Sequence, residues 1–181
     1  MSVWLTTDGD VDQLADAATR QKVTGALEAA RRGQDDDPVA QKIREATASV
    51  NRDAAGNWPR VKEFIEFALR MGVKTIGLAF CTGLKSEATV LRELLESHGL
   101  TVCGVACSVE GPCNSAGQAE VLNALGVDLN VLLGLCVGHD AVFMRHAHAP
   151  ATVVGVKDKV TCHNPVAVLT CPYQQRKLFK Q

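Results

Sequence analysis

The sequence lacks the features that identify nucleic-acid-binding and membrane proteins. Its 181 residues carry 19 basic and 20 acidic side chains, and no basic cluster exceeds two residues, so neither nucleic acid nor a membrane is an expected partner. No apolar run approaches the roughly 20 residues of a membrane helix. The first residues, MSVWLTTDGDVD, have neither the basic nor the apolar region of a signal peptide. We therefore expect a cytoplasmic protein whose partner is a small molecule or another protein.

Motifs for the common cofactors are also missing. No G-x-G-x-x-G follows a predicted strand and no G-x-x-x-x-G-K-[ST] occurs, so neither a dinucleotide nor a nucleoside triphosphate is indicated. The sequence has no C-x-x-C, which leaves zinc ribbons and thioredoxin-like motifs without support. Organic cofactors therefore become less favoured than a metal.

Cysteine is absent from the first eighty residues and frequent afterwards. Seven cysteines follow, an odd number that argues against a disulfide framework in a cytoplasmic chain. Free thiols, metal ligands and buried apolar residues remain as their roles. The cysteines stand at positions 81, 103, 107, 113, 136, 162 and 171.

Residues 1–57 are predicted to form a helical N-terminal cap or arm. The acidic turn GQDDDP at 33–38 separates polar helical segments whose apolar stripe is thin. Pro38 after three aspartates suits the first turn of the last of these helices. We expect this region to cover the main domain or to contact a partner.

Residues 58–181 show alternating helix and strand patterns. We predict helices over 59–72, 83–99, 114–126 and 139–148, and strands over 73–80, 100–109, 127–136 and 151–157, with 165–170 as a candidate fifth strand. Strands separated by helices indicate a mainly parallel sheet with helices on its faces. The predicted fold is therefore a doubly wound, Rossmann-like α/β domain of four or five strands.

Five of the seven cysteines map to the predicted carboxyl ends of the strands, the edge at which α/β sheets bind ligands. Cys81, Cys107 and Cys136 lie at or near strand ends, Cys113 lies in the loop after the second strand, and Cys162 follows the fourth. We expect Cys81, Cys113 and Cys136 to share a ligand or catalytic role, with Cys107 as the next candidate. The other two cysteines fit packing roles.

Thiolates gathered from separate loops can leave one metal position open, as catalytic metal sites require. Soft, all-sulfur ligation favours a [4Fe–4S] cluster on Cys81, Cys113 and Cys136, with Cys107 as the fourth or alternate ligand. A zinc ion held by two or three thiolates and a histidine is the alternative.

Titratable residues accompany the cysteines at the same edge. His139 and Asp140 begin the helix after the third predicted strand, and His163 follows the fourth, so we predict that they transfer protons. Lys85 lies in the first turn of a helix, where a cation is unfavourable, and we predict that it holds an anionic group. The lysines of KDK at 157–159 could do likewise.

Four stretches of the sequence, GLAFCTGLKSEA, PCNSAGQAEVLN, DLNVLLGLCVGHDAVF and APATVVGVKDKVTCHNPVAVL, resemble a bacterial and archaeal family of unknown function usually labelled metal-binding protein. The resemblance covers about residues 58–172 and implies an α/β core. Members of that family begin with a cysteine-rich stretch, whereas this chain begins with cysteine-free helices. The positions that match are Cys81, Cys107, Cys113, Cys136, His139, Asp140, His163 and Asn164.

Three functional hypotheses follow. The first is a metal-dependent enzyme, a lyase or sulfur-removing enzyme, whose open iron acts as Lewis acid on a small anionic or sulfur-containing substrate. The second is a non-catalytic protein that binds or delivers zinc, copper or persulfide sulfur. The third is thiol redox chemistry between Cys107 and Cys113, whose six-residue gap could close in one loop. A homodimer is compatible with each hypothesis.

Overall fold

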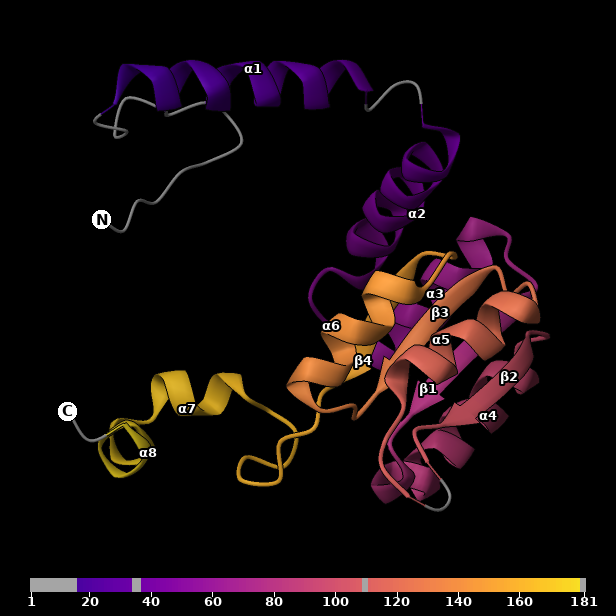
Figure 1. Cartoon of the computed structure of the whole chain (residues 1–181). Coiled ribbons are helices and arrows are strands. Elements are labelled where there is room, and N and C mark those ends of the chain that lie inside the picture. Colours follow the sequence, from indigo (N-terminus) through magenta and orange to yellow (C-terminus); the bar gives the residue numbers. More distant parts are fainter. Residues whose placement is uncertain (1–15, 34–36, 109–110, 180–181) are drawn as a thin grey trace. The chain divides into compact units, whose positions relative to one another are not determined.

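Figure 1 shows the computed structural model of the chain, which describes residues 16–33, 37–108 and 111–179. The chain divides into two compact units, Met1–Asp53 and Ala54–Gln181. No helix among the described residues is long and apolar enough to cross a membrane.

The N-terminal unit contains α1 (Ala17–Gly33) and most of α2 (Pro38–Ala54). Both helices begin at an aspartate that accepts hydrogen bonds from backbone N–H groups of the first turn. Asp16 Oδ2 accepts from Thr19 N at 2.7 Å, and Asp37 Oδ1 accepts from Val39 N at 3.0 Å. The helical character predicted for residues 1–15, and residues 34–36 of the acidic turn, lie outside the described residues.

The second unit is built on a four-stranded parallel sheet, which confirms the predicted fold class. Its strands are β1 (Thr75–Phe80), β2 (Thr101–Ala106), β3 (Leu129–Leu133) and β4 (Ala151–Gly155), in the order β2-β1-β3-β4. The chain moves to one side of β1 for β2 and to the other side for β3 and β4. The carboxyl ends of β1 and β3 therefore form the switch point at which doubly wound sheets bind ligands.

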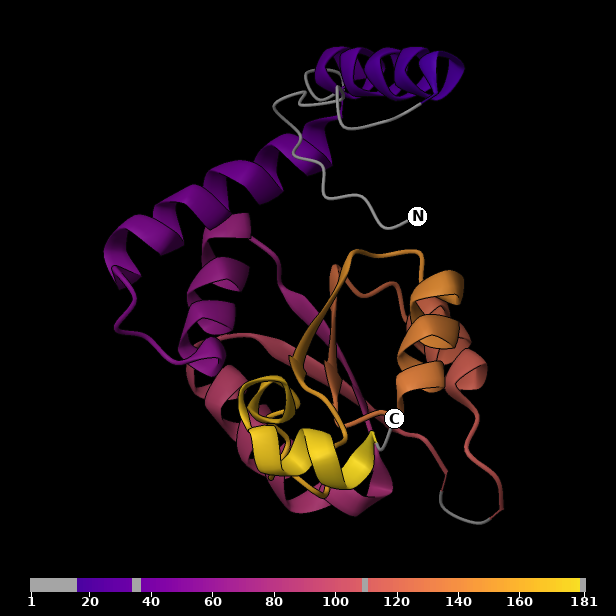
Figure 2. The same cartoon turned by 90° about the vertical axis from the view of Figure 1, so that its left-hand side faces the viewer.

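Helices cover both faces of this sheet (Figure 2). On one face, α3 (Arg60–Met71) and α4 (Lys85–Ser97) bury Phe64 and Leu95 against Leu78 and its neighbours. On the other face, α5 (Ser115–Ala124) and α6 (Val137–His146) bury Leu122 and Phe143 against Ala79 and its neighbours. Successive strand residues thus enter opposite cores, and the whole of β3 is buried, as expected for a strand covered on both faces.

The prediction of a fifth strand at 165–170 was wrong, because this stretch forms α7 (Val166–Thr170), followed by α8 (Pro172–Leu178). A short apolar run cannot be assigned to helix or strand by periodicity alone. Pro165, at φ −63 and ψ −23, has helical geometry, and its carbonyl accepts from Val168 N, which starts the helical turn.

Hydrogen bonds close the amino-terminal edge of the sheet. Asp128, just before β3, accepts from Lys74 N and Thr75 N, both at 2.8 Å, and these bonds lower the pKa of its carboxyl group. Gly99, at φ 81, follows α4 in the left-handed region that turns the chain toward β2. Hydrogen bonding to the backbone and a left-handed turn therefore account for the presence of Asp128 and Gly99 at this edge.

Candidate functional site

Four cysteines lie at the opposite, carboxyl-terminal edge of the sheet, in the segments that follow its first three strands. Cys81 directly follows β1 and precedes the short 3-10 turn η1 (Thr82–Leu84) that leads into α4. Cys107 directly follows β2, and Cys113 precedes Asn114, the N-cap of α5. Cys136 is the N-cap of α6. The chain thus delivers one or two thiols from each of the first three strands.

Cys107 lies at the centre of this group. Its side chain is buried, with 5% of its surface exposed. Its Sγ accepts a hydrogen bond from Thr82 N at 3.5 Å, lies 3.6 Å from Thr82 Oγ1, and accepts from Cys113 Sγ at 3.5 Å. Two donors, Thr82 N and Cys113 Sγ, therefore point at this sulfur, an arrangement that favours its thiolate form.

The two neighbouring thiols have different affinities for a proton. Burial raises the pKa of Cys107, but hydrogen bonds from the Thr82 backbone and hydroxyl, and from Cys113 and Cys81, outweigh it and lower the pKa to about 7. The pKa of Cys113 is raised, because this thiol donates to Cys107 and lies near the charges of Cys107, Cys81 and Cys136. Near pH 7 Cys107 is therefore partly thiolate, while the exposed Cys113 keeps its proton.

Lys157 brings a positive charge to the same group. It lies beyond β4, and its Nζ donates to Cys81 Sγ at 3.0 Å. The hydrogen bond to Cys81, together with the charges of Cys81, Cys136 and Cys107, raises the pKa of the ammonium group despite partial burial. Lys157 is therefore the cation that faces the four cysteines.

The helix starts that follow Cys81 and Cys136 have no side-chain cap. Neither η1 nor α6 receives a capping hydrogen bond from its N-cap cysteine, whereas α5 is capped by Asn114, which accepts from Gly117 N at 2.8 Å. The positive end of the α6 dipole therefore faces Cys136, and it favours an anion there.

Gln118 lies beside the site and connects the ends of two of its strands. It is 1% exposed on α5, and its Nε2 donates to Phe80 O at 3.2 Å and to Val105 O at 2.7 Å, just before Cys81 and Cys107. Its Oε1 is buried without a hydrogen-bond partner among the described residues. Gln118 thereby ties together the ends of β1 and β2 that carry two of the thiols.

Thr82 and Gln118 were not among the site residues predicted from the sequence. Lys85 was predicted as the lysine that holds an anionic group, with Lys157 only as a further option. The only sequence signal for Thr82 was its place directly after Cys81. Lys85 is exposed in the first turn of α4, and no hydrogen bond or ion pair among the described residues joins it to a cysteine.

His139 and Asp140 lie in the first turn of α6, after Cys136. Burial raises the pKa of the Asp140 carboxyl group, although the nearby His139 opposes this shift. Asp140 Oδ1 is buried and has no hydrogen-bond partner among the described residues. This carboxyl group is therefore suited to hold a proton more tightly than an ordinary aspartate.

His163 stabilises the loop that follows β4. Its Nδ1 lies 2.9 Å from Val156 O and 3.1 Å from Asp158 N, and its own N–H donates to Asp158 O at 2.7 Å. Both Cys162 and His163 have positive φ values, 52 and 66. Within the described part of the chain, no hydrogen bond connects this loop histidine to the four cysteines.

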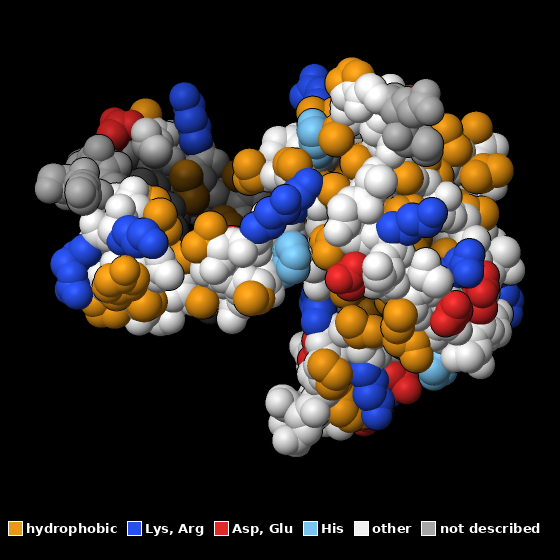
Figure 3. All heavy atoms as spheres, turned by 90° about the horizontal axis from the view of Figure 1, so that it is seen from below, with side chains coloured by type: hydrophobic (Ala, Val, Ile, Leu, Met, Phe, Trp, Pro, Cys, Tyr) orange, Lys and Arg blue, Asp and Glu red, His pale blue; other side chains and the backbone are white. Residues whose placement is uncertain are grey.

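The remaining cysteines lie apart from this group: Cys103 within β2, Cys162 exposed in the loop after β4, and Cys171 between α7 and α8. Among the residues that the structure describes, no group of three or more His, Cys, Asp or Glu side chains is arranged to hold a metal ion. Figure 3 shows the molecule from below, where hydrophobic side chains are interspersed with single charged and histidine side chains.

Comparison with known proteins covers most of the chain. The profile of a family described as a protein of unknown function (DUF1847) matches residues 18–112 and 108–154. The chain is also 37% identical over 156 residues to the uncharacterized protein MJ0455 of Methanocaldococcus jannaschii, an alignment that covers 77% of this chain and 81% of that protein. No solved structure matches.

These matches correct the extent of the resemblance predicted from the sequence. The family match begins at residue 18 rather than near 58, so it includes α1 and α2, and it ends at residue 154, before the His163-Asn164-Pro165 stretch. The family description names no metal. Both matches together show that this chain belongs to the DUF1847 family of proteins of unknown function.

Proposed function

We propose that this protein carries out two-electron thiol–disulfide chemistry on a small sulfur-containing molecule, with Cys107 and Cys113 as its redox pair. The contact between their sulfur atoms, 3.5 Å apart, is the observation that carries the proposal. A disulfide bond is about 2.05 Å long, so the two sulfurs need to approach by only about 1.5 Å.

Cys107 is the attacking group. Its thiolate attacks one sulfur of a substrate disulfide, R–S–S–R′; a Cys107–S–R bond forms, the S–S bond breaks, and R′S⁻ leaves. Cys113, which is protonated at neutral pH, gives its proton to this leaving group. The Thr82 N–H, 3.5 Å from Cys107 Sγ, holds the attacking sulfur in place.

Cys113 then completes the exchange. Having lost its proton, it attacks the Cys107 sulfur, forms the Cys107–Cys113 disulfide and releases RS⁻. The substrate gains two electrons and the pair loses two. Two equivalents of an external thiol return the pair to the reduced state.

The surroundings of the pair restrict the substrate. Because Cys107 is 5% exposed, only a small or slender molecule reaches its sulfur. Lys157 at 3.0 Å from Cys81 Sγ and the uncapped start of α6 favour an anionic group on that molecule. A small anionic disulfide or persulfide therefore fits the site best.

The test is to equilibrate the protein in glutathione redox buffers and to map its disulfides by mass spectrometry of peptides prepared without reductant. We expect Cys107–Cys113 to be the main disulfide. It should be absent in Cys107→Ser and Cys113→Ser and unchanged in the control Cys162→Ser, whose cysteine is exposed outside the group. Other pairings in the wild type would contradict the proposal.

A soft metal centre, the [4Fe–4S] cluster or zinc predicted from the sequence, is the second candidate. The contact of Cys107 with Cys113 and their electrostatic interaction with Cys81 support it, since thiolates are the ligands of both, but among the described residues no three such side chains are arranged as a ligand set. Two thiolates on one tetrahedral zinc ion lie roughly 3.8 Å apart, close to the 3.5 Å between Cys107 and Cys113. His139 and Asp140 would then be the proton-transfer groups beside it, in the elimination chemistry of a lyase or sulfur-removing enzyme.

Purification without oxygen separates the two candidates. A brown protein with matched iron and sulfide, or one equivalent of zinc, that is lost in Cys136→Ala supports the metal centre. A colourless protein without bound metal and with seven free thiols supports the redox pair, for which Cys136 is not required.

A further inference from the structure

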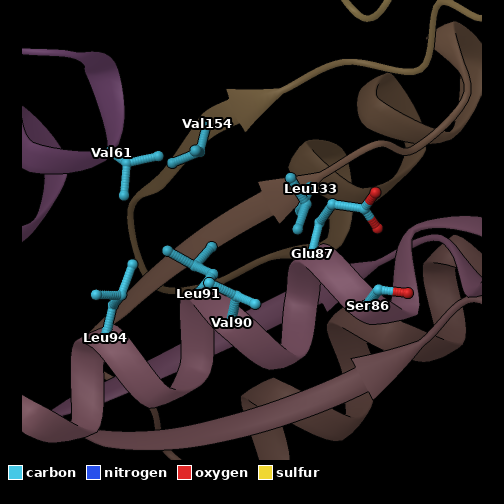
Figure 4. Close-up of a pocket in the computed structure, with 8 residues that line it drawn as sticks. All are labelled: Val61, Ser86, Glu87, Val90, Leu91, Leu94, Leu133 and Val154. Carbon is cyan, nitrogen blue, oxygen red and sulfur yellow. The ribbon is translucent and has the colours of Figure 1, made fainter.

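An apolar groove on the second unit has no occupant among the described residues of the single chain. It lies between α3 and α4 above the ends of β3 and β4 (Figure 4), with a volume of about 330 Å³. Among the described residues, Glu87 is the one charged side chain that lines it. The apolar lining consists of Val61, Val90, Leu91, Leu94, Leu133 and Val154.

The groove is open to solvent along α4. Val90 and Leu94 are exposed, whereas Leu91 and Leu133 are buried and form its floor. Exposed apolar side chains that surround a hollow mark an interaction site. No residue of α7 or α8 lines the groove.

The C-terminal helices of the same chain carry an apolar surface without a partner. α7 has five residues and α8 has seven, and isolated helices of this length are marginal in water, so they need packing from outside. Neither helix contains a buried residue. Leu169 is 70% exposed and Tyr173 is 62% exposed, and the other large exposed apolar residues here are Val166, Leu178 and Phe179.

We propose that α7 and α8 of one copy occupy the α3–α4 groove of a second copy, in a reciprocal exchange that forms a twofold dimer. The leucine and valine side chains that line the groove are apolar, as are the exposed side chains of α7 and α8, the two helices that are called the tail below. Arg176 and Lys177, in the last turn of α8, complement Glu87 in the groove. Reciprocal exchange fills two grooves and covers two tails, as twofold symmetry requires.

The connection between β4 and α7 is held by its own hydrogen bonds and by Lys157. Asp158 accepts from Val160 N at 3.0 Å and from Thr161 N at 3.2 Å, and its backbone carbonyl accepts from His163 N at 2.7 Å. Lys157 Nζ is held at Cys81. These bonds order the turn at residues 158–163 that precedes α7, and neither α7 nor α8 lines the groove of its own chain.

The test is the molar mass in solution, measured by size-exclusion chromatography with light scattering over a range of concentrations. We expect the wild type to be a dimer. Leu169→Asp in the tail and Leu94→Asp in the groove should each weaken it on the order of a hundredfold. Val121→Asp, at an exposed apolar position on α5, should leave it intact, and circular dichroism checks that each variant is folded.

A mixing experiment distinguishes exchange from other interfaces. Leu169→Asp retains its groove and Leu94→Asp retains its tail, so a mixture of the two should form a heterodimer through one intact contact, tighter than either variant alone. A monomeric wild type, a dimer that survives both substitutions, or a mixture that stays monomeric would overturn the proposal. Its failure leaves the Cys107–Cys113 disulfide unaffected, so the two proposals are tested separately.

Discussion

The amino-terminal and carboxyl-terminal edges of the same sheet differ in the titratable groups that they carry and in the pKa shifts of those groups. At the amino-terminal edge, Asp128 accepts from two backbone N–H groups, and its pKa is lowered by these bonds. At the carboxyl-terminal edge, the pKa of Cys107 is lowered to about 7 and that of Asp140 is raised, and the helix starts that follow Cys81 and Cys136 have no side-chain cap.

The two edges therefore contribute differently: the amino-terminal edge contributes to stability, and the carboxyl-terminal edge carries the activated thiol. The bonds of Asp128 at the amino-terminal edge connect chain segments and hold its carboxyl group in the ionised form. At the other edge, Thr82 and Cys113 donate to one sulfur and lower the pKa of its thiol to about 7. Buried groups with shifted pKa values beside incomplete hydrogen bonding are typical of functional sites. Substitutions at the two edges should therefore change different properties.

The largest expected effect is on the redox pair. Cys113→Ser should abolish the disulfide of Cys107 completely, because the sulfur 3.5 Å away is the one that closes the bond. The free energy of unfolding should change by no more than about 1 kcal/mol, since Cys113 is exposed. Peptide mapping and urea unfolding check both results. A new disulfide from Cys107 to Cys81 or Cys136 would show that the pair is not specific.

Next in size is a packing effect at the carboxyl-terminal edge. Gly134 has φ 67, and a methyl group there would overlap Leu84 Cδ1, whereas Gly99 at the amino-terminal edge has open space around it. Gly134→Ala should therefore cost about 3 kcal/mol in the free energy of unfolding, and Gly99→Ala about 1 kcal/mol. Equal costs in urea unfolding would show that Leu84 moves aside freely.

A smaller effect is expected at Thr82. Thr82→Val removes the hydroxyl near Cys107 but keeps the backbone N–H, so the pKa of Cys107 should rise by about one unit. The thiolate fraction at pH 7 would then fall roughly fivefold. Ultraviolet thiolate absorbance as a function of pH measures it, with Thr89→Val, in the middle of α4, as the matched control. An unchanged curve would show that the Thr82 hydroxyl does not lower this pKa and would leave the Thr82 backbone, Cys113 and Cys81 as its causes.

The smallest effect is expected at Asp128. Asp128→Ala should lower the free energy of unfolding by about 1 kcal/mol, because two backbone donors lose their acceptor. The pKa of Asp128 is lowered in the folded protein, so its contribution is complete at neutral pH and disappears as the pH falls through that lowered value. The variant should therefore differ from wild type at pH 7 and approach it in acid, while the Cys107 titration stays unchanged.

The sequence predicted the parallel α/β fold because its strands are short β-branched runs between amphipathic helices, a pattern that depends on local periodicity. It also placed Cys81, Cys107, Cys113 and Cys136 near strand ends, and parallel strands bring their carboxyl ends to one edge. Contacts that depend on side-chain direction, such as those of Thr82, could not be predicted in this way.

The choice between Lys85 and Lys157 and the secondary structure of α7 show the same limit of prediction from the sequence. Lys85 and Lys157 both follow strands in the sequence, but only the fold shows that Lys157 Nζ lies 3.0 Å from Cys81 Sγ. The VAVLT run forms α7 rather than a strand because five apolar residues have no decisive periodicity.

The most direct test of an activated thiol pair is the difference in ultraviolet thiolate absorbance between the wild type and Cys107→Ser across the pH range. We expect one thiolate to form in the wild type with a midpoint at about pH 7 and to be missing from the variant. If the two curves coincide below pH 8, or if the missing transition lies near 9, Cys107 is an ordinary buried thiol and the account is wrong.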